Sequence, residues 1–147
     1  MTDALQCLLD RVEISDLLAR YSTALDSRDW ELLRDVFVPD ADCEYGALGH
    51  PHGVDEIIAL VRATLDGLDA TQHLVGNIVV SVDGDAATAE AYLIAQHIRR
   101  GAAGGDDYLI GGRYSDLLAR TPAGWRIAHR TIHRMWWTGN RDVIRRP

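Results

Sequence analysis

The fold is decided by the stretch at residues 71–100, TQHLVGNIVVSVDGDAATAEAYLIAQHIRR. Its two apolar, β-branched runs, Thr71–Val82 and Ala86–Arg100, flank the turn Asp83-Gly84-Asp85 and predict two antiparallel strands. Two further runs of this kind follow at Tyr108–Arg120 and Trp125–Thr138. We therefore predict four consecutive antiparallel strands, bent with the help of the glycines Gly76, Gly111 and Gly112.

Helices are predicted upstream of these strands. Apolar residues recur at three- and four-residue steps from Ala4 to Leu25, which predicts an amphipathic helix whose inner face consists of Leu5, Leu8, Val12, Leu18, Tyr21 and Leu25. Asp29 is placed to cap a second helix that runs through Trp30, Leu33 and Phe37 and is ended by Pro39. A short strand at Asp42–Gly46, a loop at Gly49–Gly53 and a third helix at Val54–Leu68 complete this half.

Helices first and strands afterwards is the order of an α+β protein. We expect one domain over residues 1–147, because this length matches a single domain. Its N-terminal helices should pack on a strongly curved antiparallel β-sheet and close over the concave side, leaving a pocket open at one end.

Composition excludes several classes of function. The net charge of −7 argues against a nucleic-acid partner, because phosphate binding needs a basic surface. No apolar run approaches the roughly 20 residues of a membrane helix, and the N-terminus, from Met1 to Ala4, has no secretion signal, so a cytoplasmic location is expected. The chain contains no lysine, which excludes Schiff-base chemistry on lysine. Cys7 and Cys43 are too few for a disulfide framework or a zinc site.

His73 and Asp26 are the candidate catalytic pair. An imidazole takes up and returns a proton near neutral pH, and a carboxylate bonded to its second nitrogen fixes the tautomer and stabilises the imidazolium. Taken singly, each residue has an ordinary interpretation, His73 as a hydrogen-bonded core histidine and Asp26 as a residue at a helix end. Their combination suggests a small enzyme that transfers protons.

Several segments carry a resemblance to a known family. The stretch Leu25-Asp26-Ser27-Arg28-Asp29-Trp30, the pair Glu44-Tyr45, the stretch Thr71-Gln72-His73 and the last-strand start Gly124-Trp125-Arg126-Ile127 resemble the cone-shaped proteins related to nuclear transport factor 2 and the SnoaL-like polyketide cyclases. Within that superfamily the sequence is most similar to scytalone dehydratase. The resemblance covers most of the chain and implies the cone-shaped fold.

The resemblance also implies a lyase that eliminates water without a metal or organic cofactor. In that family a histidine paired with an aspartate removes a proton next to a carbonyl, which assigns His73 and Asp26, and tyrosines hold a water against the carbonyl oxygen. Tyr45 and His97 match the substrate-side positions. Leu25 stands where the family has a second tyrosine, and Tyr21, one helical turn earlier, is a candidate replacement. The family has a serine and an asparagine on the fourth strand that this chain lacks. Arg113 lies in that region, where an arginine would bind a carboxylate or an oxyanion.

Three questions stay open from the sequence. A three-residue loop at Asp83–Asp85 places His73 and His97 on one face of the sheet, whereas a two-residue loop separates them unless a bulge corrects the register. The same pair of residues also suits an isomerase, a polyketide cyclase or a dehydrohalogenase acting on a small cyclic or aromatic-precursor ketone, and a non-catalytic small-molecule-binding module is a further alternative. We expect a homodimer or homotrimer, which light scattering would refute by showing a monomer.

Overall fold

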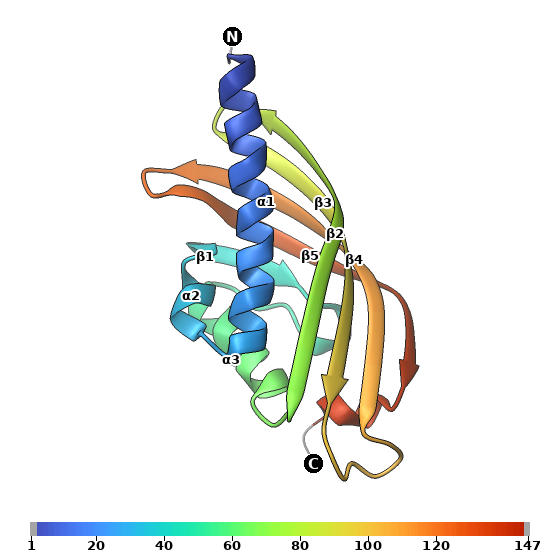
Figure 1. Cartoon of the computed structure of the whole chain (residues 1–147). Coiled ribbons are helices and arrows are strands. Elements are labelled where there is room, and N and C mark those ends of the chain that lie inside the picture. The colour runs from blue at the N-terminus through green and yellow to red at the C-terminus, as the bar shows by residue number, and fades with distance from the viewer. Residues whose placement is uncertain (1–2, 146–147) are drawn as a thin grey trace.

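The computed structural model describes residues 3–145, in which one long helix and two short ones cover one face of a five-stranded sheet (Figure 1). The helices are α1 (Ala4–Ser27), α2 (Trp30–Arg34) and α3 (Val54–Leu65), with short 3-10 turns η1 (Gly46–Leu48) and η2 (Arg141–Ile144). The strands are β1 (Phe37–Glu44), β2 (Ala70–Asp83), β3 (Ala86–Ile98), β4 (Asp107–Thr121) and β5 (Gly124–Gly139). This architecture confirms the predicted α+β fold.

The sheet has the order β1-β5-β4-β3-β2, and its last four strands form the predicted antiparallel meander. The predicted antiparallel sheet has one exception, because β1 pairs parallel to β5 and makes the sheet mixed. We call the face covered by the helices the concave face and the opposite one the outer face. The prediction that the chain has no secretion signal used residues 1–4. Of these, residues 1–2 lie outside the described residues. Within residues 3–145, no helix has the length and apolar character needed to cross a membrane.

The predicted second helix is too long. It ends at Arg34, and Phe37 and Pro39 belong to β1, which begins earlier than the predicted strand. Pro39 is tolerated there because β1 lies at the edge of the sheet, where a missing N–H leaves no ladder hydrogen bond unmade. The third helix likewise ends at Leu65 instead of Leu68.

Only the C-terminal half of the predicted inner face of α1 is buried. Leu18, Tyr21 and Leu25 are buried, but Leu5, Leu8 and Val12 are 59%, 58% and 52% exposed. The residue that faces the sheet at this end is Asp10, which accepts two hydrogen bonds from Arg120 at 2.7 and 2.8 Å and one from the indole of Trp125 at 3.1 Å. The buried stripe of α1 runs from Asp10 through Ile14 and Leu17 to Tyr21, so Leu5, Leu8 and Val12 lie outside it.

A bulge in β2 decides which way its histidine faces. Asp83 pairs with Ala86 across a two-residue turn, which by alternation alone would place His73 and His97 on opposite faces. The register shifts between Gly76 and Val79, where Asn77 adopts a positive φ of 50°. Beyond this shift His73 pairs with Ala95 and both histidines lie on the concave face, so the open question is answered by the bulge.

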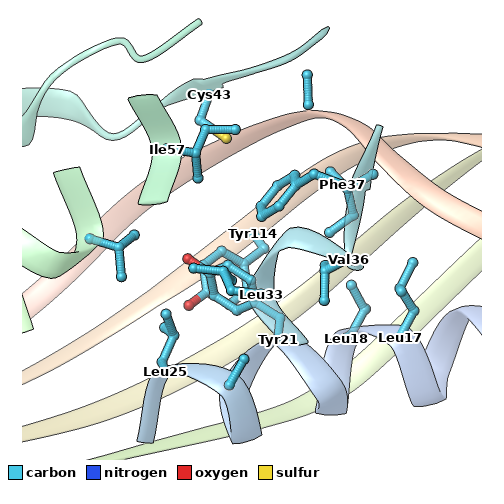
Figure 2. Close-up of a cluster of buried hydrophobic side chains, with 14 of the residues drawn as sticks. Leu17, Leu18, Tyr21, Leu25, Leu33, Val36, Phe37, Cys43, Ile57 and Tyr114 are labelled. Atoms are coloured by element: carbon cyan, nitrogen blue, oxygen red, sulfur yellow. The ribbon is translucent and has the colours of Figure 1, made fainter. Parts of the chain in front are cut away.

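The hydrophobic core lies between α1, α2, α3 and the concave face (Figure 2). Leu17, Leu18 and Leu25 of α1 meet Leu33, Val36 and Phe37 there, and Tyr21 packs edge-to-face on Phe37 and Tyr114 at 6.0 and 5.7 Å between ring centroids. These contacts seat the last two turns of α1 against the sheet and thereby position Asp26.

The outer face exposes several large hydrophobic side chains. Leu74, Tyr92 and Ile94 are exposed on it, and Trp136 lies over Gly111, where a Cβ atom would overlap the indole ring. The predicted bends at Gly76 and between Gly111 and Gly112 coincide with register shifts. The predicted homo-oligomer would cover such a face, and its existence stays a prediction.

Candidate functional site

Asp26 and His73 lie in direct contact. The Nδ1 atom of His73 is 2.7 Å from Oδ1 of Asp26, and the backbone N–H of His73 donates to Oδ2 at 2.9 Å. The carboxylate thus binds both the ring and the backbone of the same residue, which leaves the imidazole little freedom to rotate. The side chain of His73 is 6% exposed and that of Asp26 is 27% exposed.

Asp26 is positioned by the end of α1. Arg28, in the left-handed conformation with a φ of 59°, ends the helix, and its guanidinium donates to the hydroxyl of Thr71 at 3.0 Å. Thr71 in turn donates to Oδ1 of Asp26 at 3.0 Å. Arg28 and Thr71 both belong to the family-like segments, but neither was predicted as a site residue. The available signals were that Thr71 lies two residues before His73 and that Arg28 lies at the helix end, two residues after Asp26.

The contacts keep Asp26 ionised and select the tautomer of His73. Burial by itself would raise the pKa of Asp26, but hydrogen bonds from the side chain and backbone of His73 outweigh it and lower the pKa below its usual value. Because the carboxylate is ionised it accepts, and Nδ1–H of His73 donates. The remaining lone pair is therefore on Nε2 of His73, which makes no hydrogen bond to residues 3–145.

His97 lies beside the pair as a second, neutral imidazole. Its ring is 5.5 Å from that of His73 between centroids, and its Nδ1 is 3.2 Å from the carbonyl oxygen of Tyr108. A carbonyl only accepts, so Nδ1 of His97 carries the hydrogen and Nε2 is an acceptor. Burial, followed by the charge of His73, lowers the pKa of His97 to about 4. At neutral pH His97 can therefore accept a hydrogen bond from a bound hydroxyl group.

This pKa predicts an acid-dependent loss of stability. The folded pKa of His97 is about 4 against 6.5 for an unperturbed histidine, so between these values the unfolded chain binds the extra proton and stability falls as the pH falls. We expect His97 to cost the wild type about 2–3 kcal/mol of unfolding free energy between pH 7 and pH 4.5.

Urea unfolding at both pH values measures the effect. His97→Asn keeps a donor for the Tyr108 carbonyl and removes the titrating ring, so its loss of stability on acidification should be smaller than that of the wild type by about the amount that His97 contributes. Parallel losses in the two proteins would refute the assignment.

Two tyrosines complete the polar lining. The hydroxyls of Tyr21 and Tyr45 are 3.1 Å apart, so one donates to the other and the pair keeps one hydroxyl hydrogen for a further acceptor. Burial raises the pKa of both tyrosines, which keeps them protonated and able to donate. The structure thus brings both predicted tyrosines to the site, and their roles there stay predictions.

These side chains surround an inner chamber that opens into a wider mouth. The chamber, of about 80 Å³, is lined by His73, His97, Tyr21 and Tyr45 together with apolar residues. The mouth, of about 390 Å³, shares His97, Tyr45, Ile110 and Ile132 with it. A separate groove of about 550 Å³ between α1 and β2 also reaches Asp26 and His73. We assign ligand binding to the chamber, because only there do His97 and the tyrosines join His73.

Arg113 does not belong to the site, so its predicted role in substrate binding is wrong. It lies on the outer face, where its Nε pairs with Glu90 at 3.2 Å, and its side chain is 45% exposed. Tyr114, the next residue, points to the concave face and lines the chamber. A shift of one position in the alternation of a strand is enough to exchange the two faces.

The buried arginine of the concave face is Arg130, which sequence analysis missed. Its Nε and Nη2 donate to the two carboxylate oxygens of Asp116 at 2.7 Å each, and both side chains are fully buried. The guanidinium lies between the rings of Tyr21 and Tyr114, 4.2 and 3.9 Å from their centroids. The missing signal was the cross-strand register that pairs Asp116 with Arg130.

The remaining nucleophiles and possible ligands offer no second site. Burial raises the pKa of Cys43 to about 11, so its thiol stays protonated, and Cys7 and Cys43 are both free. In the described part of the chain, no group of three or more histidine, cysteine, aspartate or glutamate residues is placed to hold a metal ion.

Comparisons with known proteins place this geometry in context. The model of a family described as a SnoaL-like domain matches residues 6–131. An uncharacterised protein of Mycobacterium tuberculosis is 39% identical over 126 residues, which is 82% of each chain.

Two solved structures show the same fold. A candidate scytalone dehydratase of Novosphingobium aromaticivorans matches with a TM-score of 0.82 and 22% identity, over 90% of this chain and 89% of its own. A hexachlorocyclohexane dehydrochlorinase of Novosphingobium barchaimii matches with a TM-score of 0.84 and 18% identity, over 99% of both chains. At these identities the likeness concerns the fold alone.

Proposed function

Because the chain belongs to the SnoaL-like domain family, we propose that it is a cofactor-independent lyase of the dehydratase type, acting on a small cyclic or aromatic-precursor ketone. The observation that carries the proposal is the 2.7 Å contact between Asp26 and Nδ1 of His73 beside the inner chamber. A carboxylate-oriented imidazole with a free Nε2 is the arrangement of a general base.

The proposed reaction has two proton transfers. Nε2 of His73 takes a proton from the carbon next to the carbonyl, and the electrons of that C–H bond move onto the carbonyl oxygen. The free hydroxyl of the Tyr21–Tyr45 pair stabilises the developing oxyanion, directly or through a water. The oxyanion then collapses, a carbon–carbon double bond forms, and the hydroxyl on the next carbon leaves as water with the proton returned by His73. Asp26 stays ionised and stabilises the imidazolium.

A different reaction on the same residues is the main alternative. Without a leaving group, the proton returned by His73 would go to another carbon, as in an isomerase or cyclase. With a halide as leaving group the enzyme would be a dehydrohalogenase, the activity that names one of the similar structures. A non-catalytic binding module is disfavoured by the direct contact between Asp26 and His73, which binding alone does not require.

Deuterium exchange tests proton abstraction without knowledge of the natural substrate. We expect the protein in deuterated buffer to speed deuterium incorporation next to the carbonyl of α-tetralone or β-tetralone, as followed by NMR. Exchange no faster than with heat-denatured protein, for both ketones, would count against the proposal. Mass spectrometry of a product then separates the reactions, because loss of water, loss of acid and no loss differ in mass.

A further inference from the structure

The mouth of the cavity is cationic in an otherwise acidic protein. The guanidinium groups of Arg134, Arg141 and Arg145 line it, and no aspartate or glutamate does. The whole chain carries a net charge of −7. Such a local reversal of charge at a cavity entrance attracts anions and repels cations.

Two of these arginines have no carboxylate partner in the part of the chain that the structure describes. Arg145 pairs with Asp142 at 3.2 Å, but within residues 3–145 neither Arg134 nor Arg141 forms an ion pair with a carboxylate. Arg134 donates through Nη1 to the hydroxyl of Tyr108 at 3.3 Å, and the guanidinium of Arg141 lies 5.3 Å from the ring centroid of Trp137. By contrast, Arg113, Arg120 and Arg130 each have an acidic partner.

The mouth is continuous with the candidate catalytic residues. The ring centroid of His97 is 5.5 Å from that of His73 and 5.8 Å from that of Tyr108. The hydroxyl of Tyr108 accepts a hydrogen bond from Arg134. A small molecule in the cavity can therefore place one end at His73 and the other among the arginines. Ile110 and Ile132 contribute apolar side chains to the wall between them.

We propose that the substrate is a keto acid, in which a carboxylate is bound by Arg134 and Arg141 at the mouth while the acidic C–H next to the ketone lies at His73. The inference rests on the proposed function for the placement of the ketone, whereas the carboxylate contact stands on the mouth alone. The planar guanidinium forms two parallel hydrogen bonds to a carboxylate, and the tyrosine that holds Arg134 reduces its freedom before binding.

Binding of a matched pair of probes tests the carboxylate contact. We expect para-acetylbenzoate to bind on the order of tenfold more tightly than its methyl ester, because the ester keeps the ring and ketone but has no charge. Isothermal titration calorimetry measures both dissociation constants. Raising the salt concentration should weaken binding of the acid and leave the ester unchanged, since exposed charges are screened.

Variants locate the contact. Arg134→Gln and Arg141→Gln should each weaken the acid several-fold and the double variant should abolish its advantage over the ester. Arg113→Gln, which makes the same change of charge on the outer face, should bind both probes like the wild type. Thermal unfolding of each variant checks that the fold is intact.

The outcomes separate this inference from the proposed function. Asp26→Asn should still prefer the acid over the ester even though the proposed proton transfer is lost. Equal affinity for the two probes, no measurable binding of the acid, or an undiminished preference in the double variant would overturn the inference. Tighter binding of para-acetylphenyl phosphate than of the carboxylate would overturn the assignment to a carboxylate.

Discussion

Replacing His73 by alanine should lower the rate of proton abstraction by 10²-fold or more, within the range of about 10²–10⁴ that a positioned general base contributes. The variant loses Nε2, which is the free lone pair next to the chamber, and keeps the Tyr21–Tyr45 hydroxyl pair. Some rate above that of buffer should remain, because oxyanion stabilisation does not depend on the base. The measurement is deuterium incorporation into the tetralones under identical conditions.

Asp26→Asn should produce a loss of similar size for a different reason. The amide is nearly isosteric with the carboxylate, but it is neutral and does not stabilise the imidazolium that forms when His73 accepts a proton. The matched control is Asp16→Asn, the same change on the exposed side of α1. Near-normal exchange in both His73→Ala and Asp26→Asn would end the proposed role of the pair.

The largest effect on stability is expected at the pair of Arg130 and Asp116. Arg130→Met leaves the buried carboxyl group of Asp116 without its partner, and Asp116→Asn leaves the guanidinium of Arg130 without one. Each change should cost about 3–5 kcal/mol of unfolding free energy. Arg130→Met also loses the contacts of the guanidinium with the faces of Tyr21 and Tyr114, at 4.2 and 3.9 Å. Burial by itself would lower the pKa of Arg130, yet the charge of Asp116 and its hydrogen bonds raise it, so the guanidinium stays charged in the core.

Urea unfolding at neutral pH measures this cost. Arg113→Met is the control, because its partly exposed pair with Glu90 should contribute no more than about 1 kcal/mol. The double variant Arg130→Met with Asp116→Leu should recover much of the stability lost in the single variants, since no charge is then left unpaired. A single variant as stable as the wild type would contradict this account of the core.

Site residues within family-like segments were predictable from the sequence, whereas those that depend on strand faces and cross-strand registers were not. The contact of Asp26 with His73 was expected because family-like segments surround both residues. Arg113 was misplaced because alternation along β4 alone does not say which face is concave. Arg130 was missed because its partner Asp116 is a cross-strand neighbour, and that register is set partly by the shift between Leu117 and Leu118.

The order of helices and strands, the glycines at which the sheet bends and the residues of the candidate catalytic pair were all predictable without a structure. They depend on local periodicity, turn chemistry and similarity to a family. Three outcomes followed only from long-range packing: His73 and His97 share a face, Asp10 is buried where Leu5 and Leu8 are exposed, and Arg134 and Arg141 line the cavity mouth. Those outcomes depend on a bulge and on cross-strand registers, where a shift of one residue reverses a side chain and no local pattern records it.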